Sequence, residues 1–308
     1  MKHKWKALAM RLQILTYGHL LNPLWHSHDD RRRRRKSVIA DAKMKYLRRF
    51  LTFVKEMPVP EPYHTDHDTR DEERAFTLWL QGEDQAPPIV RSCIRSMRRH
   101  ISLPLEALDE KNLMRRISLP DHIIEKWKKG VISRTHFSDI CRIELLYEHG
   151  GIWADATDFF TAPVPDDILA RDFFLFMAGD NIKLGGTHAF VQSCFIRAKK
   201  GNPLIAMWRQ LVFEYWKEED TLIDYFTLHF LFRLLVENNE EAGRLFSAMP
   251  RLNSDLTHVL WWQLKDEKYT QELYRENTEQ SFFQKTTYKD ASARTPLPGS
   301  VAEYLINS

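Results

Sequence analysis

The stretch of sequence that decides the fold is HFSDICRIELLYEHGGIWADATD, residues 136–158. Its first part predicts a helix over 138–149, because Ser138 is a good N-cap, apolar residues recur at helical spacing and a glycine follows. Residues 152–154 are apolar and few enough for a short buried strand. Such a strand delivers Asp155 to its carboxyl end, the edge at which α/β sheets place their ligands.

Three charged side chains of this stretch are expected to converge. Asp139 and Arg142 are three residues apart and share one face of the predicted helix. Gly150 and Gly151 let the chain turn tightly back into the sheet, so that Asp155 emerges beside the helix start. Carboxylates and a guanidinium in one crevice suit sugar hydroxyls and a divalent cation that neutralises a diphosphate leaving group. Each residue alone is typical of a helix cap, an i,i+3 pair or a turn, but the complete string favours a site.

The flanking segments predict an α/β fold. Residues 75–80 are typical of a buried strand that ends at Gln81 and Gly82, and 89–100 of the helix that follows it. Further elements are expected in this order: a strand and a turn within 105–119, a helix over 120–129, a strand over 173–178, and helices over 203–216 and 222–236. The predicted architecture is a nucleotide-binding type of sheet flanked by helices, with a largely helical C-terminal part.

Charge is unevenly distributed along the 308 residues. Residues 1–57 contain fifteen Lys and Arg against four Asp and Glu, a net charge of +11, so the remainder carries −8 of the overall +3. Residues 56–73 are rich in proline and charge, which is typical of a linker. We therefore predict a basic helical appendage over 1–57 and a linker over 58–74.

The three cysteines, Cys93, Cys141 and Cys194, are widely spaced and form no CxxC pair. This pattern argues against a zinc site and against a disulfide framework. Free thiols are typical of proteins from a reducing compartment.

The N-terminal segment has two possible roles. Residues 5–25 are apolar but interrupted by polar side chains, so neither a spanning helix nor a signal peptide is predicted. An apolar stripe that includes Trp5, Leu8 and Leu12 precedes the basic run 31–36, which suits the surface of an anionic membrane and a cytoplasmic protein held at the inner face. The alternative is a helix packed on the body. No nucleic acid is expected as a partner, because no aromatic platform accompanies the basic run.

The pattern Ser138-Asp139-x-x-Arg142, an apolar helix, Gly150-Gly151, Trp153 and Asp155 resembles the DXD-containing sugar transferases of glycosyltransferase family 32. It is most similar to their bacterial branch, the capsular polysaccharide synthesis proteins. Stretches at 78–100, 108–112, 117–139, 199–208, 221–226 and 284–289 are also similar to that family. The resemblance therefore covers residues 75–290, which we expect to be the catalytic domain, followed by a tail over 291–308.

The resemblance implies a GT-A fold and transfer of a sugar, with retention of anomeric configuration, from a nucleotide-sugar donor. A UDP-sugar with Mn²⁺ or Mg²⁺ is expected. The acceptor would be a surface or capsular polysaccharide or a lipid-linked oligosaccharide. By position, Asp139 and Arg142 would hold the donor hexose, and Asp155 would contact metal and ribose. The other donor-binding residues that it implies are Ser138, Trp79, Gln81 and Gly82.

One position departs from the family pattern. The DXD register reads Asp155-Ala156-Thr157, so that its second carboxylate is missing and Asp158 follows one residue late. The expected metal ligands are therefore Asp155, Thr157 and Asp158. The same departure leaves open an alternative function, a catalytically degenerate protein that binds sugar nucleotides or serves as a scaffold in polysaccharide assembly.

Three further residues are candidates for the site. Asp224, on a predicted helix in an apolar setting, would orient the acceptor hydroxyl or stabilise positive charge in the transition state, or else would be an acid at a helix start. Lys285 and Lys289 would neutralise the donor diphosphate, or else would be exposed surface lysines.

Overall fold

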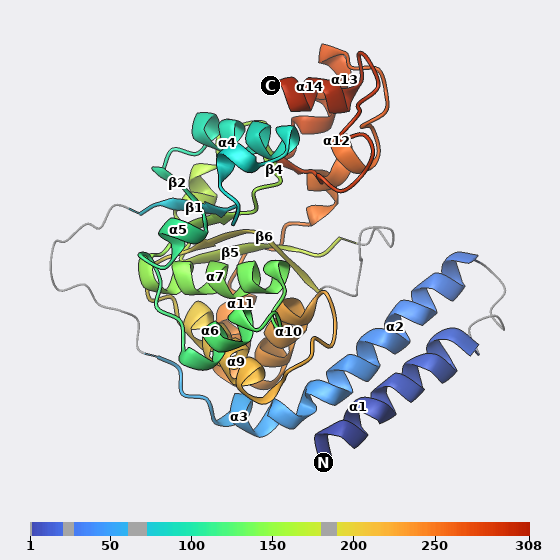
Figure 1. Ribbon diagram of the computed structural model, residues 1–308, viewed down its shortest axis with the longest axis vertical. Helices are drawn as coiled ribbons and strands as arrows, with labels where there is room; N and C mark the ends of the chain where they lie inside the picture. Colours follow the sequence, from blue (N-terminus) through green and yellow to red (C-terminus); the bar gives the residue numbers. More distant parts are fainter. Residues whose placement is uncertain (1, 21–27, 61–72, 180–189) are drawn as a thin grey trace, which may run out of the picture.

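The computed structural model describes residues 2–20, 28–60, 73–179 and 190–308. Its centre is a five-stranded sheet with the strand order β2-β1-β3-β6-β5 (Figure 1). The strands are β1 (Ala75–Leu78), β2 (Leu105–Leu108), β3 (Gly151–Ala154), β5 (Phe173–Met177) and β6 (Val191–Ala198). β1 is parallel to β2 and to β3, whereas β6 is antiparallel to its two neighbours, β3 and β5.

Helices cover both faces of the sheet. α4 (Pro88–His100) and the C-terminal helix α14 (Val301–Asn307) lie on one side, and α7 (Arg134–His149), α9 (Pro203–Glu218) and α10 (Thr227–Asn238) lie on the other (Figure 1). The remaining helices are α1 (Lys2–Gln13), α2 (His28–Leu47), α3 (Leu51–Glu56), α5 (Glu110–Leu113), α6 (Asp121–Lys128), α8 (Asp166–Leu169), α11 (Glu240–Ser247), α12 (Val259–Trp262) and α13 (Gln271–Thr278). The predicted fold class, an α/β sheet flanked by helices with a largely helical C-terminal part, is confirmed.

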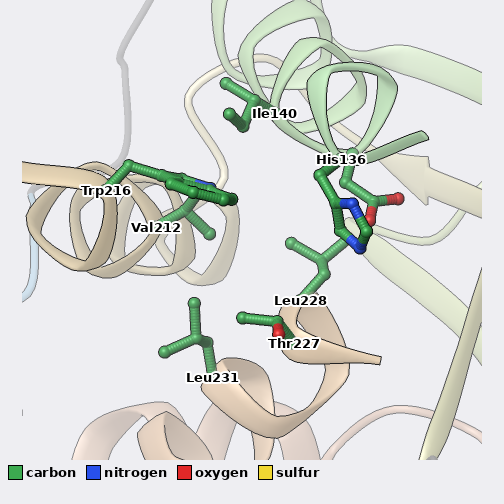
Figure 2. A pocket seen from close by; sticks show the side chains of 8 residues that line it. His136, Ile140, Val212, Trp216, Thr227, Leu228 and Leu231 are labelled. Atoms are coloured by element: carbon green, nitrogen blue, oxygen red, sulfur yellow. The ribbon is translucent and has the colours of Figure 1, made fainter. Parts of the chain in front are cut away.

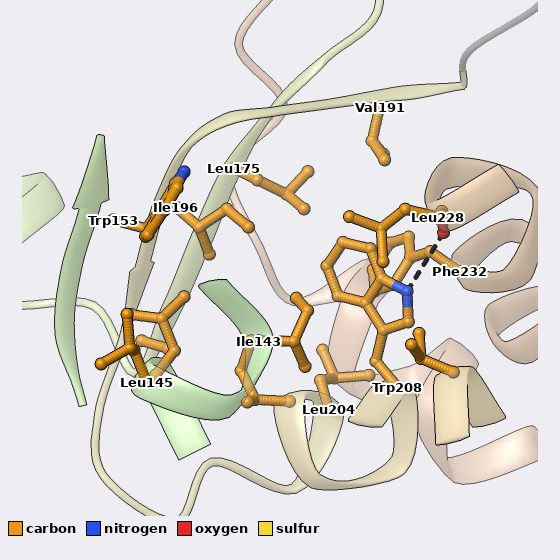
Figure 3. Packing of buried hydrophobic residues seen from close by; sticks show 14 of the residues in the cluster. Ile143, Leu145, Trp153, Leu175, Val191, Ile196, Leu204, Trp208, Leu228 and Phe232 are labelled. Atoms are coloured by element: carbon orange, nitrogen blue, oxygen red, sulfur yellow. Dashed lines mark hydrogen bonds between the residues drawn. The ribbon is translucent and has the colours of Figure 1, made fainter. Parts of the chain in front are cut away.

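The main hydrophobic core lies between the sheet and α7, α9 and α10. Ile143 of α7, Ile196 of β6 and Leu204 of α9 are among its buried residues, as Figure 3 shows. Trp208 is also fully buried, and its indole Nε1 donates to the carbonyl of Leu228 at 3.1 Å, which joins α9 to α10. A second cluster lies under α4 and α14. All three cysteines are free and buried.

The core begins earlier in the chain than the predicted domain boundary at residue 57. Leu47, Phe50 and Val54, at the end of α2 and in the segment through α3, are buried in the main core. The side-chain amide of Asn239 also donates to the carbonyls of Val54 and Met57. The second half of the predicted appendage is therefore packed into the body, and only α1 and the first part of α2 project from it as a helical hairpin (Figure 1).

Two helices begin at other residues than predicted. α7 begins after Ser133, whose hydroxyl accepts from the backbone N–H of His136, so Ser138 lies inside the helix. α10 begins at Thr227 rather than at 222, since the Asp224 carboxylate accepts from the backbone N–H of Phe226 in the turn before it. The first segment contains two serines that can cap a helix, Ser133 and Ser138, and local sequence does not rank them.

The turn from α7 into β3 depends on two glycines. Gly150 and Gly151 have φ angles of +67° and +95°, which side-chain-bearing residues rarely adopt. A Cβ at Gly151 would lie 1.9 Å from the carbonyl oxygen of Arg74, and one at Gly150 would lie 2.3 Å from the backbone nitrogen of Lys200. Residues with side chains would therefore not fit at positions 150 and 151, where the chain enters the sheet.

We predict that Gly151→Ala lowers the free energy of unfolding by about 3 kcal/mol or more, because backbone must move to admit the methyl group. The matched control is Gly130→Ala. Gly130 has a φ of +70° but open space around it, so that substitution should cost only the conformational penalty of about 1 kcal/mol. Urea unfolding followed by circular dichroism measures both. Equal losses in the two variants would show that the contact with Arg74 is unimportant.

Candidate functional site

Three charged side chains meet where α7 lies beside the end of β3. Arg142 Nη2 is 3.0 Å from Asp139 Oδ1, one helical turn earlier, and 3.0 Å from Asp155 Oδ1, immediately after β3. The side chains of Asp139 and Arg142 are 11% and 6% exposed and that of Asp155 is 24% exposed, so the group is buried but reachable at Asp155. The structure thus brings together the three residues that the sequence predicted to converge.

The guanidinium of Arg142 is fixed on its other side as well. Its Nη1 donates to both the carbonyl and the hydroxyl oxygen of Ser193 on β6, each at 2.6 Å, and the group lies 5.1 Å from the centre of the Trp153 ring. Burial opposes its charge, but the carboxylates of Asp155 and Asp139 outweigh burial and raise the pKa of Arg142. The guanidinium is therefore a permanently charged group in a rigid position.

Asp155 accepts hydrogen bonds at both carboxylate oxygens. Oδ1 accepts from the Trp153 indole at 2.9 Å and lies beside Arg142, while Oδ2 accepts from Lys285 Nζ at 2.6 Å. Burial would raise the pKa of Asp155, but Arg142 and Lys285 outweigh it and hold that pKa below its ordinary value. The carboxylate of Asp155 is consequently ionised at neutral pH.

Lys285 reaches the centre from a second, two-stranded sheet. Strand β4 (Asp158–Phe160) pairs antiparallel with β7 (Phe283–Lys285), and Asp158 stands directly opposite Lys285 in that ladder. Lys285 Nζ lies 3.0 Å from Asp158 Oδ1 and so bridges the two carboxylates of Asp155 and Asp158. The side chain of Asp158 is completely buried, and burial raises its pKa to about 7 although Lys285 opposes that shift.

The predicted acidic metal ligands contact groups of the protein. Both oxygens of Asp155 accept hydrogen bonds, and Asp158 is enclosed, with Oδ2 accepting from the backbone N–H of Asp155. Asp158 Oδ1 has no hydrogen-bond partner among the described residues but lies 3.0 Å from Lys285 Nζ. The backbone carbonyl of Thr157 accepts from the N–H and the hydroxyl of Thr286. Within the described part of the chain, no group of three Asp, Glu, His or Cys residues is placed to hold a metal ion. The ammonium of Lys285 fills the position between the two acids that a divalent cation would need.

Asp139 borders a small cavity. Burial raises the pKa of Asp139 despite the charge of Arg142. The cavity has a volume of about 10 Å³ and is lined also by His136, Trp216 and Thr227, which Figure 2 labels. Since a single water needs about that much space, the cavity is too small for a larger ligand. The charged centre is reachable instead from the side on which Asp155 and Lys285 are partly exposed.

The predicted base-binding residues follow the neighbouring strand. Trp79 comes directly after β1, as Asp155 comes directly after β3, and the two strands are parallel neighbours, so both residues lie at the same edge of the sheet. The Trp79 ring packs edge-on against Tyr288 at 5.0 Å, and its buried Nε1 has no hydrogen-bond partner among the described residues. Gly82, with Gln81 before it, closes a turn by donating its N–H to the Trp79 carbonyl at 2.8 Å.

The other predicted site residues lie away from this centre. Asp224 forms an ion pair with Lys43 of α2 rather than with the central charges. Ser138 is half-buried within α7, and Lys289 is exposed, with Nζ 5.7 Å from the Tyr288 ring. Of the two predicted lysines, only Lys285 contacts the carboxylates.

Two polar residues at the centre are absent from the sequence-based prediction. Ser193, which holds Arg142, is a small buried polar residue of β6, a strand that also contains Gln192 and Arg197, so nothing in the sequence set it apart. His229 of α10 is buried, its Nδ1 has no partner within the part of the chain that is described, and burial lowers its pKa to about 3. Its ring is therefore neutral and acts only as a hydrogen-bonding group.

Comparisons with known proteins find similarity to a curated protein and to a solved structure. The O-glycosyltransferase braB of Annulohypoxylon truncatum is 27% identical over 185 residues, which are 56% of this chain and 44% of that protein. The chain thus spans less than half the length of this relative. The structure of the PaToxG glycosyltransferase matches with a TM-score of 0.37 and 12% identity, over 70% of this chain and 83% of that one.

The family comparison covers most of the sequence. The family model described as capsular polysaccharide synthesis protein matches residues 28–301. The match begins in α2 and ends at the start of α14, so it includes the whole sheet, the charged centre and Lys285. The chain therefore belongs to the capsular polysaccharide synthesis protein family.

Proposed function

We propose that the protein is a glycosyltransferase that moves a sugar from a nucleoside-diphosphate sugar, a UDP-sugar, to a saccharide acceptor in capsular or surface polysaccharide assembly. The family and the relative named a glycosyltransferase support the reaction class. The observation that carries the proposal is the contact of Arg142 with both Asp139 and Asp155 at the edge of the sheet. Transfer with retention, and a GT-A type of donor site, are parts of the same proposal.

The residues of the centre have separate roles in this proposal. Asp155, the partly exposed member, binds the hydroxyl groups of the donor sugar by charge-assisted hydrogen bonds, and Arg142, paired with Asp139, holds it in position. Trp79, at the same edge of the sheet, offers its unpartnered indole N–H to the nucleotide. Lys285 stabilises the negative charge that develops on the diphosphate as the glycosidic bond breaks, and it is positioned before the reaction by its two carboxylates.

The hairpin of α1 and α2 supports a second proposal, that the protein binds anionic membranes. Ala7 and Met10 of α1 pack with Ala42 and Tyr46 of α2, so one side of α1 is covered. The other side leaves large apolar side chains exposed: Trp5 by 71%, Leu8 by 46%, Leu12 by 52% and Leu15 by 52%. Residues 2–20 contain no acid, and the basic run follows at 31–36. Among the described residues, no helix is both long and apolar enough to span a bilayer.

We predict that Asp155→Asn lowers kcat for donor hydrolysis or transfer by about 100-fold or more, because the substitution removes the charge that positions Arg142 and Lys285. A panel of nucleotide sugars, with product detected by chromatography, measures the rate. The matched control is Glu241→Gln, which neutralises an acid of an exposed i,i+3 pair with Arg244 on α11 and should leave the rate unchanged.

Two results would contradict this proposal. Equal rates in wild type and Asp155→Asn would show that the charged centre takes no part in the reaction. Tight binding of a nucleotide sugar by the wild type without turnover of any donor would favour the alternative, a sugar-nucleotide-binding protein without catalysis. Circular dichroism of each variant separates loss of fold from loss of function.

For the hairpin, we predict that the wild type co-sediments with vesicles containing phosphatidylglycerol and much less with vesicles of phosphatidylcholine alone. Replacing exposed Leu8 and Leu12 by Ser should weaken this binding by about tenfold or more, since the apolar surface that enters the interface is lost. Leu297→Ser is the matched control, because Leu297 is 56% exposed and lies far along the chain. Equal binding of vesicles by all three proteins would show that another surface of the protein binds the membrane.

A further inference from the structure

The ammonium of Lys285 lies between two carboxylates of the charged centre. Nζ is 2.6 Å from Asp155 Oδ2 and 3.0 Å from Asp158 Oδ1. Lys285 is thus an ammonium held by two acids, and its side chain is still 17% exposed.

A metal ion could bind between the two acids only in place of this ammonium. Asp158 begins β4, Lys285 ends β7, and the two are direct partners in the antiparallel ladder, so their backbones are held opposite each other. Asp158 is fully enclosed and Asp155 Oδ1 is occupied by Arg142 and Trp153. Asp155 Oδ2 and Asp158 Oδ1, the two oxygens that face Lys285 Nζ, would be left to a divalent cation only if the ammonium moved away, and such a cation ordinarily requires several oxygen ligands from protein and substrate.

We infer that Lys285 takes the place of the divalent cation in this protein, and that it binds the donor diphosphate directly and without a metal. The inference rests on the proposed function. An ammonium has three N–H donors, of which one is hydrogen-bonded to Asp155 Oδ2, and Asp158 Oδ1 is near as an ion-pair partner. A further N–H is available to an oxygen of the diphosphate. The two acids keep the ammonium charged and hold it in place, as the carboxylate ligands of a metal site hold a metal ion.

The first arm of the test uses Mn²⁺ alone. Electron paramagnetic resonance of a Mn²⁺ titration detects bound metal without nucleotide or activity. We expect no stoichiometric binding by the wild type. Lys285→Ala should gain a Mn²⁺ site, because the substitution leaves two facing carboxylates without their cation. Stoichiometric Mn²⁺ binding by the wild type, or a folded Lys285→Ala protein that binds none, would overturn the inference.

The second arm uses UDP and GDP in calorimetric titrations, with either EDTA or Mn²⁺ present. The wild type should bind with the same Kd, within about twofold, in both conditions. Lys285→Ala in EDTA should bind about tenfold or more weakly, the loss of one charge-assisted hydrogen bond. Lys129→Ala is the control, since Lys129 forms an exposed pair with Glu125 on the surface of α6. Nucleotide binding that requires Mn²⁺ in the wild type would overturn the inference but leave the proposed function standing.

Failure of the proposed function gives a different pattern. Neither nucleotide would bind in either condition. The Mn²⁺ titration would still show whether Lys285 occupies the position between Asp155 and Asp158. If Lys285→Ala does not fold, Lys285→Arg keeps a cation at this position and should bind UDP or GDP in EDTA. Loss of metal-free binding in a folded Lys285→Arg protein, together with Mn²⁺-dependent binding in the wild type, would count against the inference.

Discussion

The site depends on one buried guanidinium. A buried charge is costly unless it is paired and hydrogen-bonded, and Arg142 meets that condition only through three separate elements. Asp139 is on the same helix, Asp155 follows β3, and Ser193 is on β6. The relative position of α7 and the sheet is therefore constrained by electrostatics as well as by packing. Gly150 and Gly151 make the arrangement possible, because they bring β3 back beside the helix that carries the arginine.

The C-terminal part of the chain completes this centre. Lys285 enters through the β4–β7 ladder, and Tyr288, three residues later, packs against Trp79 at the end of β1. The charged centre and the predicted nucleotide-binding turn are thus joined through one short segment. The centre formed by α7 and β3 is therefore completed by Lys285, which lies 130 residues after Asp155 in the chain. The second hydrophobic cluster, under α4 and α14, packs against Tyr288 of that segment.

The sequence predicted best where interacting residues are close in the chain. Asp139, Arg142 and Asp155 fall within seventeen residues, so helix period, glycine turn and strand were enough to bring them together. Contacts between distant segments carried no local signal. Asp224 is an acid in an apolar segment, as a site residue often is, yet its partner is Lys43, 181 residues earlier. The basic N-terminal segment was predicted as an appendage for the same reason, because the partners that bury Phe50 and Val54 lie in α9 to α11 and beyond the reach of any local pattern.

The missing second acid of the DXD register has a physical explanation in this geometry. The centre contains the acids Asp139, Asp155 and Asp158 and only two bases, Arg142 and Lys285, so the carboxylates already outnumber their cations. A further carboxylate at Thr157, between two of these acids, would add negative charge to a region in which burial already raises the pKa of Asp158 to about 7. Threonine at 157 avoids that cost. The departure therefore agrees with the proposed site, in which the ammonium of Lys285 already lies between the two acids.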